Sequence, residues 1–145
     1  MTDLTTDFSY NVSEIQKNIN DCISAMSECL KYTEDGKQVI KNLSNNLKRK
    51  RIVDEDILKL LKKVSLIYLN LIGDISDKTK LYSIISAAEK IDLDYEMKMI
   101  RNFNYDGVLR ITKKISTYFN TTESKIYEIE DMLKGVINES FNTKS

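Results

Sequence analysis

Apolar residues recur along the chain at the three- and four-residue spacing of amphipathic helices. The first such stretch begins at Asn11, whose side chain is expected to cap a helix, with Glu14 three residues later completing a capping box. Six apolar residues then follow the strict a and d spacing of a coiled coil: Val12, Ile15, Ile19, Cys22, Met26 and Cys29. We expect Asp35-Gly36 to end this helix, because glycine readily adopts the left-handed conformation found just after a helix.

The next two stretches predict a basic helix end followed by an acidic helix start. One helix carries apolar residues from Val39 to Leu47 and ends in the basic run 48–51, and the next opens with the acidic run 54–56. Between about residues 54 and 75 the apolar positions surround the helix nearly completely. A helix that is apolar nearly all round is usually enclosed by other helices, so we expect this one at the centre of the fold.

The rest of the chain shows four more periodic stretches, each preceded by a capping residue. They follow Asp77, Asp92 or Asp94, Asp106-Gly107, and Thr122. The pattern therefore predicts an all-α fold, a single compact bundle of six to seven short helices around the hydrophobic helix at 54–75. We expect one domain over residues 1–145, with 1–10 and 142–145 loosely ordered.

The residue types that are missing narrow the function. The chain has no histidine, proline or tryptophan, so it lacks an imidazole base, a histidine metal ligand and a histidine-activated nucleophile. The four glycines are isolated and form no phosphate-binding loop. The acidic run Asp92-Leu-Asp94-Tyr-Glu96 resembles a divalent-metal site superficially, but a helix cap with an acidic first turn explains it better. We therefore expect no catalytic residue, no metal and no cofactor.

Cysteine spacing and hydropathy indicate an intracellular protein. Cys22 and Cys29 are seven residues apart, about 10.5 Å along a helix, which is too far for a disulfide within that helix. We expect two reduced thiols. No apolar run approaches the roughly 20 residues that a membrane-spanning helix needs, and the first residues lack the pattern of a signal peptide. These features predict a cytoplasmic protein with no membrane partner.

Charge is balanced overall and unevenly distributed. The chain has 22 basic and 22 acidic residues, yet residues 1–36 are acidic and residues 37–63 are strongly basic. The most concentrated feature is the cluster Lys48, Arg49, Lys50 and Arg51. These cations can complement the C-terminal end of a helix dipole, or they can bind an acidic partner or phosphates.

The sequence thus predicts a non-enzymatic protein-binding module, an adaptor, inhibitor or chaperone that acts through a helix face. The cluster 48–51 is the expected contact for another protein of unknown identity. The seam from Val12 to Cys29 is expected to pack inside the chain's own bundle, and self-association through this seam is the alternative. Abundant isoleucine, lysine and asparagine, whose codons are A/T-rich, suggest a phage or viral host-interaction protein or an immunity protein, acting in the host cytoplasm. The alternative is a nucleic-acid-binding regulator that uses the same basic cluster.

Overall fold

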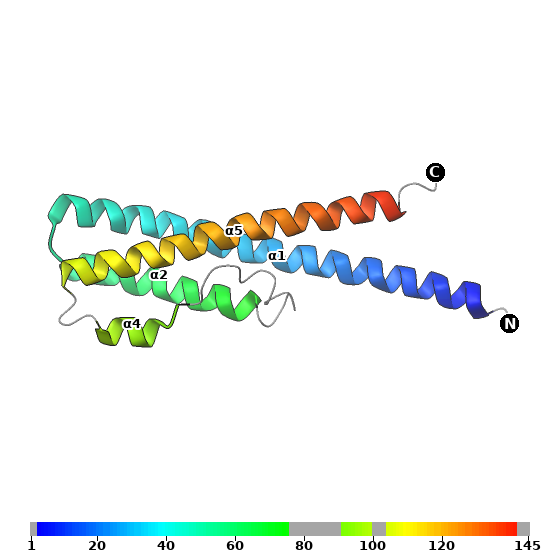
Figure 1. The fold of residues 1–145 in the computed structure, drawn as a ribbon, viewed down its shortest axis with the longest axis horizontal. Coiled ribbons are helices and arrows are strands. Elements are labelled where there is room, and N and C mark those ends of the chain that lie inside the picture. Colours follow the sequence, from blue (N-terminus) through cyan, green and yellow to red (C-terminus); the bar gives the residue numbers. More distant parts are fainter. Residues whose placement is uncertain (1–2, 76–90, 100–103, 142–145) are drawn as a thin grey trace.

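Three long helices and one short helix form the part of the chain that the structure describes, residues 3–75, 91–99 and 104–141 of a computed structural model. The helices are α1 (Asp3–Lys50), α2 (Glu55–Asp74), α4 (Leu93–Met99) and α5 (Tyr105–Phe141). The all-α class is confirmed. The predicted bundle of six to seven short helices is wrong, because the long helices α1 and α5 each replace two of the expected short ones (Figure 1).

Helix α1 runs without interruption through Gly36, where we expected it to end. A Cβ atom on Gly36 would lie 2.4 Å from Cζ of Phe119 on α5, so the glycine is needed for the close approach of the two helices. The left-handed residue that ends α1 is instead Arg51, with φ of 56°, whose N–H donates to the Leu47 carbonyl at 3.0 Å. The same helix begins at Asp3 rather than Asn11, within the stretch 1–10 that we expected to be loosely ordered.

Helix α5 likewise continues through Thr122, which was expected to cap a separate last helix. Thr122 is fully buried, and its neighbours Phe119 and Ile126 belong to the same buried stripe. The helix propensity of threonine is only a few tenths of a kcal/mol below average, so burial of a continuous apolar face easily overrides it. The expected stretch after Asp77 lies outside the described residues.

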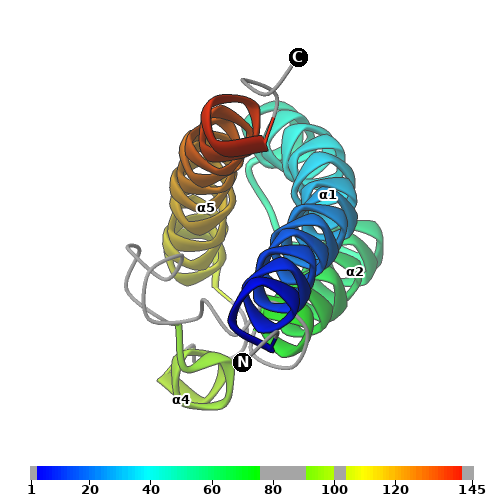
Figure 2. The same cartoon turned by 90° about the vertical axis from the view of Figure 1, so that its right-hand side faces the viewer.

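Helix α1, and not α2, lies at the centre of the fold. It packs against α5 on one side and α2 on the other, whereas α2 and α5 contact each other little; the end-on view shows this arrangement (Figure 2). The outer face of α2 stays open, with Leu66 and Leu69 exposed by 54% and 52%. The prediction that α2 lies at the centre of the fold is therefore wrong, although apolar residues do occur nearly all round this helix.

The start of α2 agrees closely with the prediction. Asp54 caps the helix, since its carboxylate accepts a hydrogen bond from the Ile57 N–H at 3.0 Å. A second cap, at α4, is also confirmed, because the Asp92 side chain accepts from the Tyr95 N–H at 3.1 Å. The acidic run 54–56 was expected to open this helix, and Asp92 was one of the two caps expected for α4, the other being Asp94.

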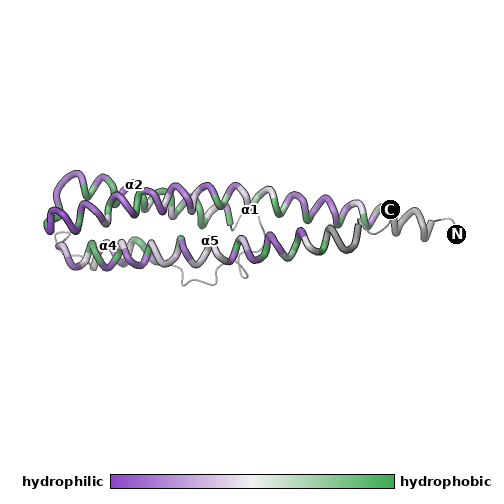
Figure 3. The backbone as a smooth tube through the Cα atoms, turned by 90° about the horizontal axis from the view of Figure 1, so that it is seen from above, coloured by the Kyte–Doolittle hydropathy of each residue, from purple (hydrophilic) through white to green (hydrophobic). Residues whose placement is uncertain are grey.

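The core is a continuous apolar strip between the three long helices. Figure 3 shows hydrophobic positions recurring among hydrophilic ones along each of them. At its centre the rings of Tyr68 and Tyr118 meet edge to face, 4.9 Å apart and at 81°. The Tyr68 hydroxyl also donates to the Ile91 carbonyl at 3.1 Å and accepts from the Ile91 N–H at 2.7 Å. This buried tyrosine thereby ties the segment before α4 to the bundle.

Candidate protein-interaction surface

The predicted cluster 48–51 lies at the end of α1, and its members have different roles. Lys50 binds two carboxylates at the start of α2, Asp54 at 2.6 Å and Asp56 at 3.7 Å. These contacts lower the pKa of Asp54, because the Lys50 ammonium and the Ile57 N–H both donate to its carboxylate. Lys50 therefore belongs to the helix junction rather than to a binding surface.

The other three members of the cluster are exposed and point to solvent. Arg49 donates to the Asn46 side chain at 2.9 Å. Within the described residues, no carboxylate lies within ion-pair distance of Lys48, Arg49 or Arg51. Three positive charges thus remain available to a partner.

Four lysines beyond the predicted cluster extend this surface. They lie on the last part of α1 and the first part of α2, are exposed, and pair with no carboxylate of the described chain: Lys41, Lys59, Lys62 and Lys63. Together with Lys48, Arg49 and Arg51 they form what we call the basic end. The charge of the segment 37–63 was visible in the sequence, but we named only its densest run. Lys41 lies seven residues before Lys48, which places both on nearly the same side of one helix. This spacing was the signal in the sequence that could have identified Lys41.

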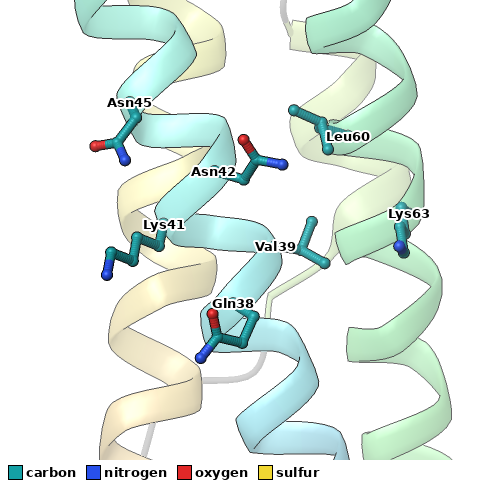
Figure 4. A pocket seen from close by; sticks show the side chains of 7 residues that line it. All are labelled: Gln38, Val39, Lys41, Asn42, Asn45, Leu60 and Lys63. Carbon is teal, nitrogen blue, oxygen red and sulfur yellow. The ribbon is translucent and has the colours of Figure 1, made fainter.

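A groove of about 430 Å³ runs between α1 and α2 at the basic end. Its lining mixes amide, ammonium and apolar groups: Gln38, Val39, Lys41, Asn42, Asn45, Leu60 and Lys63. Asn42 on α1 and Leu60 on α2 point toward each other across it (Figure 4). Lys41 extends on the far side of α1, and Lys63 lies on α2. Ammonium and amide donors of this kind suit a carboxylate-bearing ligand.

The predicted self-association seam splits into a buried and an accessible part. Met26 and Cys29 are fully buried in the core of the chain itself. Cys22 is partly buried, and burial raises the pKa of its thiol. Val12 and Ile19 are also partly exposed, and Ile15 is 53% exposed. Packing within the chain therefore buries the last two residues of the seam, Met26 and Cys29, which lie near the middle of α1.

A second pattern on α1 escaped the sequence reasoning. Acidic residues recur at strict seven-residue intervals, at positions 7, 14, 21, 28 and 35. Those whose side chains the structure describes, Glu14, Asp21, Glu28 and Asp35, are all exposed. A spacing of seven residues returns to nearly the same side of a helix, so these carboxylates form one line along the first two thirds of α1.

A polar bridge connects α1 to α5 beyond the basic end. Lys37 donates to one oxygen of Glu123 at 2.8 Å, and Thr33 donates to the other at 3.3 Å. The hydrogen bond from Lys37 raises the pKa of that lysine. Although Lys37 belongs to the basic segment of the sequence, its charge is neutralised within the fold and is not part of the basic end.

No group of three or more potential metal-binding side chains occurs in the described part of the chain. In the acidic run after α2, Asp92 caps α4, and Glu96 binds Lys114 and Arg110 of α5. Among residues 3–75, 91–99 and 104–141, no helix is long and apolar enough to cross a membrane.

No protein-family model, curated protein or solved structure matches the chain.

Proposed function

We propose that this chain is a non-enzymatic protein-binding module whose basic end binds an acidic segment of another protein. One observation carries the proposal: the basic end holds seven exposed cations without a carboxylate partner in the described chain, and two of them, Lys41 and Lys63, line the groove between α1 and α2. An adaptor, inhibitor or chaperone of the cytoplasm, or of a host cytoplasm for a phage or viral protein, would use such a surface.

The chemistry of the groove favours a helical ligand with carboxylates on one face. Leu60 and Val39 supply apolar contact at its floor, while Lys41 and Lys63 supply charge beside it. Complementary charge accelerates encounter and sets the register of binding more than it raises affinity. The expected complex is therefore moderate in affinity and strongly dependent on salt.

A synthetic acidic peptide tests this proposal. A fluorescein-labelled helical peptide with glutamates at seven-residue intervals is titrated with the protein at low and at high salt, and a peptide with glutamines at those positions is the control. Anisotropy should show binding of the glutamate peptide alone. The double variant Lys41→Glu with Lys63→Glu should weaken it by about tenfold or more, equivalent to about 1.4 kcal/mol.

The matched control is the double variant Lys98→Glu with Lys113→Glu. Both are exposed lysines, on α4 and α5, that no ion pair of the described residues involves, so their reversal changes the net charge by the same amount without touching the groove. Equal losses in the two variants would show that net charge alone attracts the peptide. Absence of binding at low salt would refute the proposal.

Nucleic-acid binding is the second candidate, and one observation favours it. Lys59, Lys62 and Lys63 on α2 lie at the same end of the molecule as Lys48, Arg49 and Arg51, which provides the second basic group that phosphate binding requires. Affinity for duplex DNA would then fall steeply with salt. Alanine at positions 48–51 should abolish it, and no binding at low salt would exclude this candidate.

A further inference from the structure

The charge of helix α1 changes sign along its length, since carboxylates outnumber lysines over the first two thirds and only cations occur in the last quarter. Its line of carboxylates occupies the first two thirds, and Lys41, Lys48 and Arg49 occupy the last quarter. A helix of 48 residues is about 72 Å long, and α1 runs through the whole molecule as one element (Figure 1). From Asp21 to Lys48 the distance along the axis is about 40 Å, several times the screening length of about 8 Å at physiological salt. The two charged regions therefore do not neutralise each other within the chain.

We infer that the groove between α1 and α2 receives the acidic half of α1 from a second copy of the chain, in an antiparallel dimer. The inference rests on the proposed function, since it names an occupant for the same groove. The ligand described above, a helix with carboxylates at seven-residue intervals on one face, is present in this chain at Glu14 and Asp21.

A two-fold axis makes the contact reciprocal. In an antiparallel pair the N-terminal half of each α1 lies against the C-terminal half of the other, and every contact occurs twice. An axis near Lys31 brings Glu14 of each copy opposite Arg49 of the other and Asp21 opposite Asn42, beside Lys63. The same register places Glu28 of each copy opposite Asp35 of the other, and the exposed Lys31 of each copy lies beside these carboxylates near the axis.

This interface differs from the seam expected from the sequence. Met26 and Cys29 of that seam are inside the fold, whereas Glu14 and Asp21 are exposed and have no ion pair with the described residues. The line of carboxylates lies on the outer side of the same helix. The dimer therefore needs no rearrangement of the core.

Sedimentation equilibrium with charge-swapped variants tests the dimer. The wild-type protein should form dimers at micromolar concentration and low salt, and monomers near 1 M salt, where charges are screened beyond about 3 Å. The variant Glu14→Lys with Asp21→Lys, and the variant Arg49→Glu with Lys63→Glu, should each be monomeric, with dissociation constants raised about tenfold or more. Circular dichroism should show that both remain folded, since all four side chains are exposed.

Mixing the two variants is the decisive experiment. The lysines of one variant then face the glutamates of the other, and the second groove keeps its native charges, so a heterodimer should form although each variant alone is a monomer. A wild-type monomer at all concentrations would overturn the inference. So would dimers that survive both charge reversals, because they would place the interface elsewhere.

The acidic peptide separates failure of this inference from failure of the proposed function. The monomeric variant Glu14→Lys with Asp21→Lys has a free groove, so it should bind the peptide more tightly than wild type does. If the peptide binds equally well to both proteins and the wild type is a monomer, the proposed function is supported and the dimer is refuted. If the peptide binds to neither protein, the proposed function and the dimer are both refuted.

Discussion

Replacing Gly36 by alanine measures how closely α1 and α5 approach. The new Cβ atom would lie 2.4, 2.6 and 2.8 Å from three carbon atoms of the Phe119 ring, Cζ, Cε2 and Cε1. All three distances are far below van der Waals contact. The ring is fully buried, so either the helices must separate or the ring must leave its rotamer.

Two opposing effects set the magnitude. Alanine stabilises a helix interior by about 1 kcal/mol relative to glycine, whereas forcing an extra carbon into a packed core costs about 1–3 kcal/mol. The net effect of Gly36→Ala alone is therefore between about zero and about 2 kcal/mol of destabilisation. A matched control isolates the packing cost: at Gly135, also inside a long helix, an added Cβ would meet nothing within 4 Å.

The assay is urea and thermal unfolding followed by circular dichroism. Gly135→Ala should stabilise the protein by up to about 1 kcal/mol, and Gly36→Ala should be about 1–3 kcal/mol less stable than that control. For a chain of this size the difference corresponds to roughly 2–4 °C in Tm per kcal/mol. Equal stabilisation by the two alanines would show that Phe119 does not pack on Gly36, and the continuous close contact of α1 with α5 would be refuted.

A second substitution identifies the ring as the cause. In a Phe119→Leu background the atoms that Gly36→Ala would meet are gone, so the alanine should recover most of its helix-stabilising effect. The coupling energy of the double-mutant cycle should then lie between about 0.5 and 3 kcal/mol. A coupling energy near zero would assign the cost to some other neighbour.

Three further outcomes are expected. Tyr68→Phe should cost about 1–3 kcal/mol in urea unfolding, because it leaves the carbonyl and N–H of Ile91 without their shared partner; an unchanged midpoint would contradict this. The carboxylate of Asp54 has a lowered pKa, so its contribution to stability is present above its unfolded pKa of about 4 and is lost as the pH falls through the lower folded value. Stability measured between pH 6 and pH 2 should therefore fall less in Asp54→Asn than in wild type, and parallel curves would contradict the ion pair with Lys50. The raised pKa of the Cys22 thiol predicts slow alkylation by iodoacetamide near pH 8 that accelerates above pH 9, measured by mass spectrometry; labelling at the rate of a free cysteine would count against its burial.

Local features of the fold could be predicted from the sequence, and long-range ones could not. The helix start at the acidic run 54–56 and a cap at Asp92 or Asp94 could be predicted because a helix start and the residues that mark it are neighbours in sequence. The prediction that Gly36 ends a helix was wrong because glycine is favoured in two situations. It is common just after a helix end, and it also occurs where two helices approach each other closely. The residue that decides between them, Phe119, lies 83 positions away in the chain.

The same distinction applies to the candidate surface. The basic run 48–51 is local, so it was visible at once, although Lys50 turned out to belong to the helix junction. Lys41 and Lys63 line one groove only because α1 and α2 pack side by side. That packing is a tertiary contact, and the pattern of either helix alone does not show which of its lysines lies beside the other helix.

The close contact at Gly36 also determines what the charges can do. If α1 had ended there, the acidic segment and the basic segment would have formed two helices joined by a turn, and antiparallel packing would have brought their opposite charges side by side. They would then have neutralised each other within the chain. Because Phe119 packs against an uninterrupted helix, the carboxylates of Glu14 and Asp21 stay tens of ångströms from Lys48 along a single axis. A chain with no net charge thus keeps an acidic region and a basic end that do not pair with each other along α1.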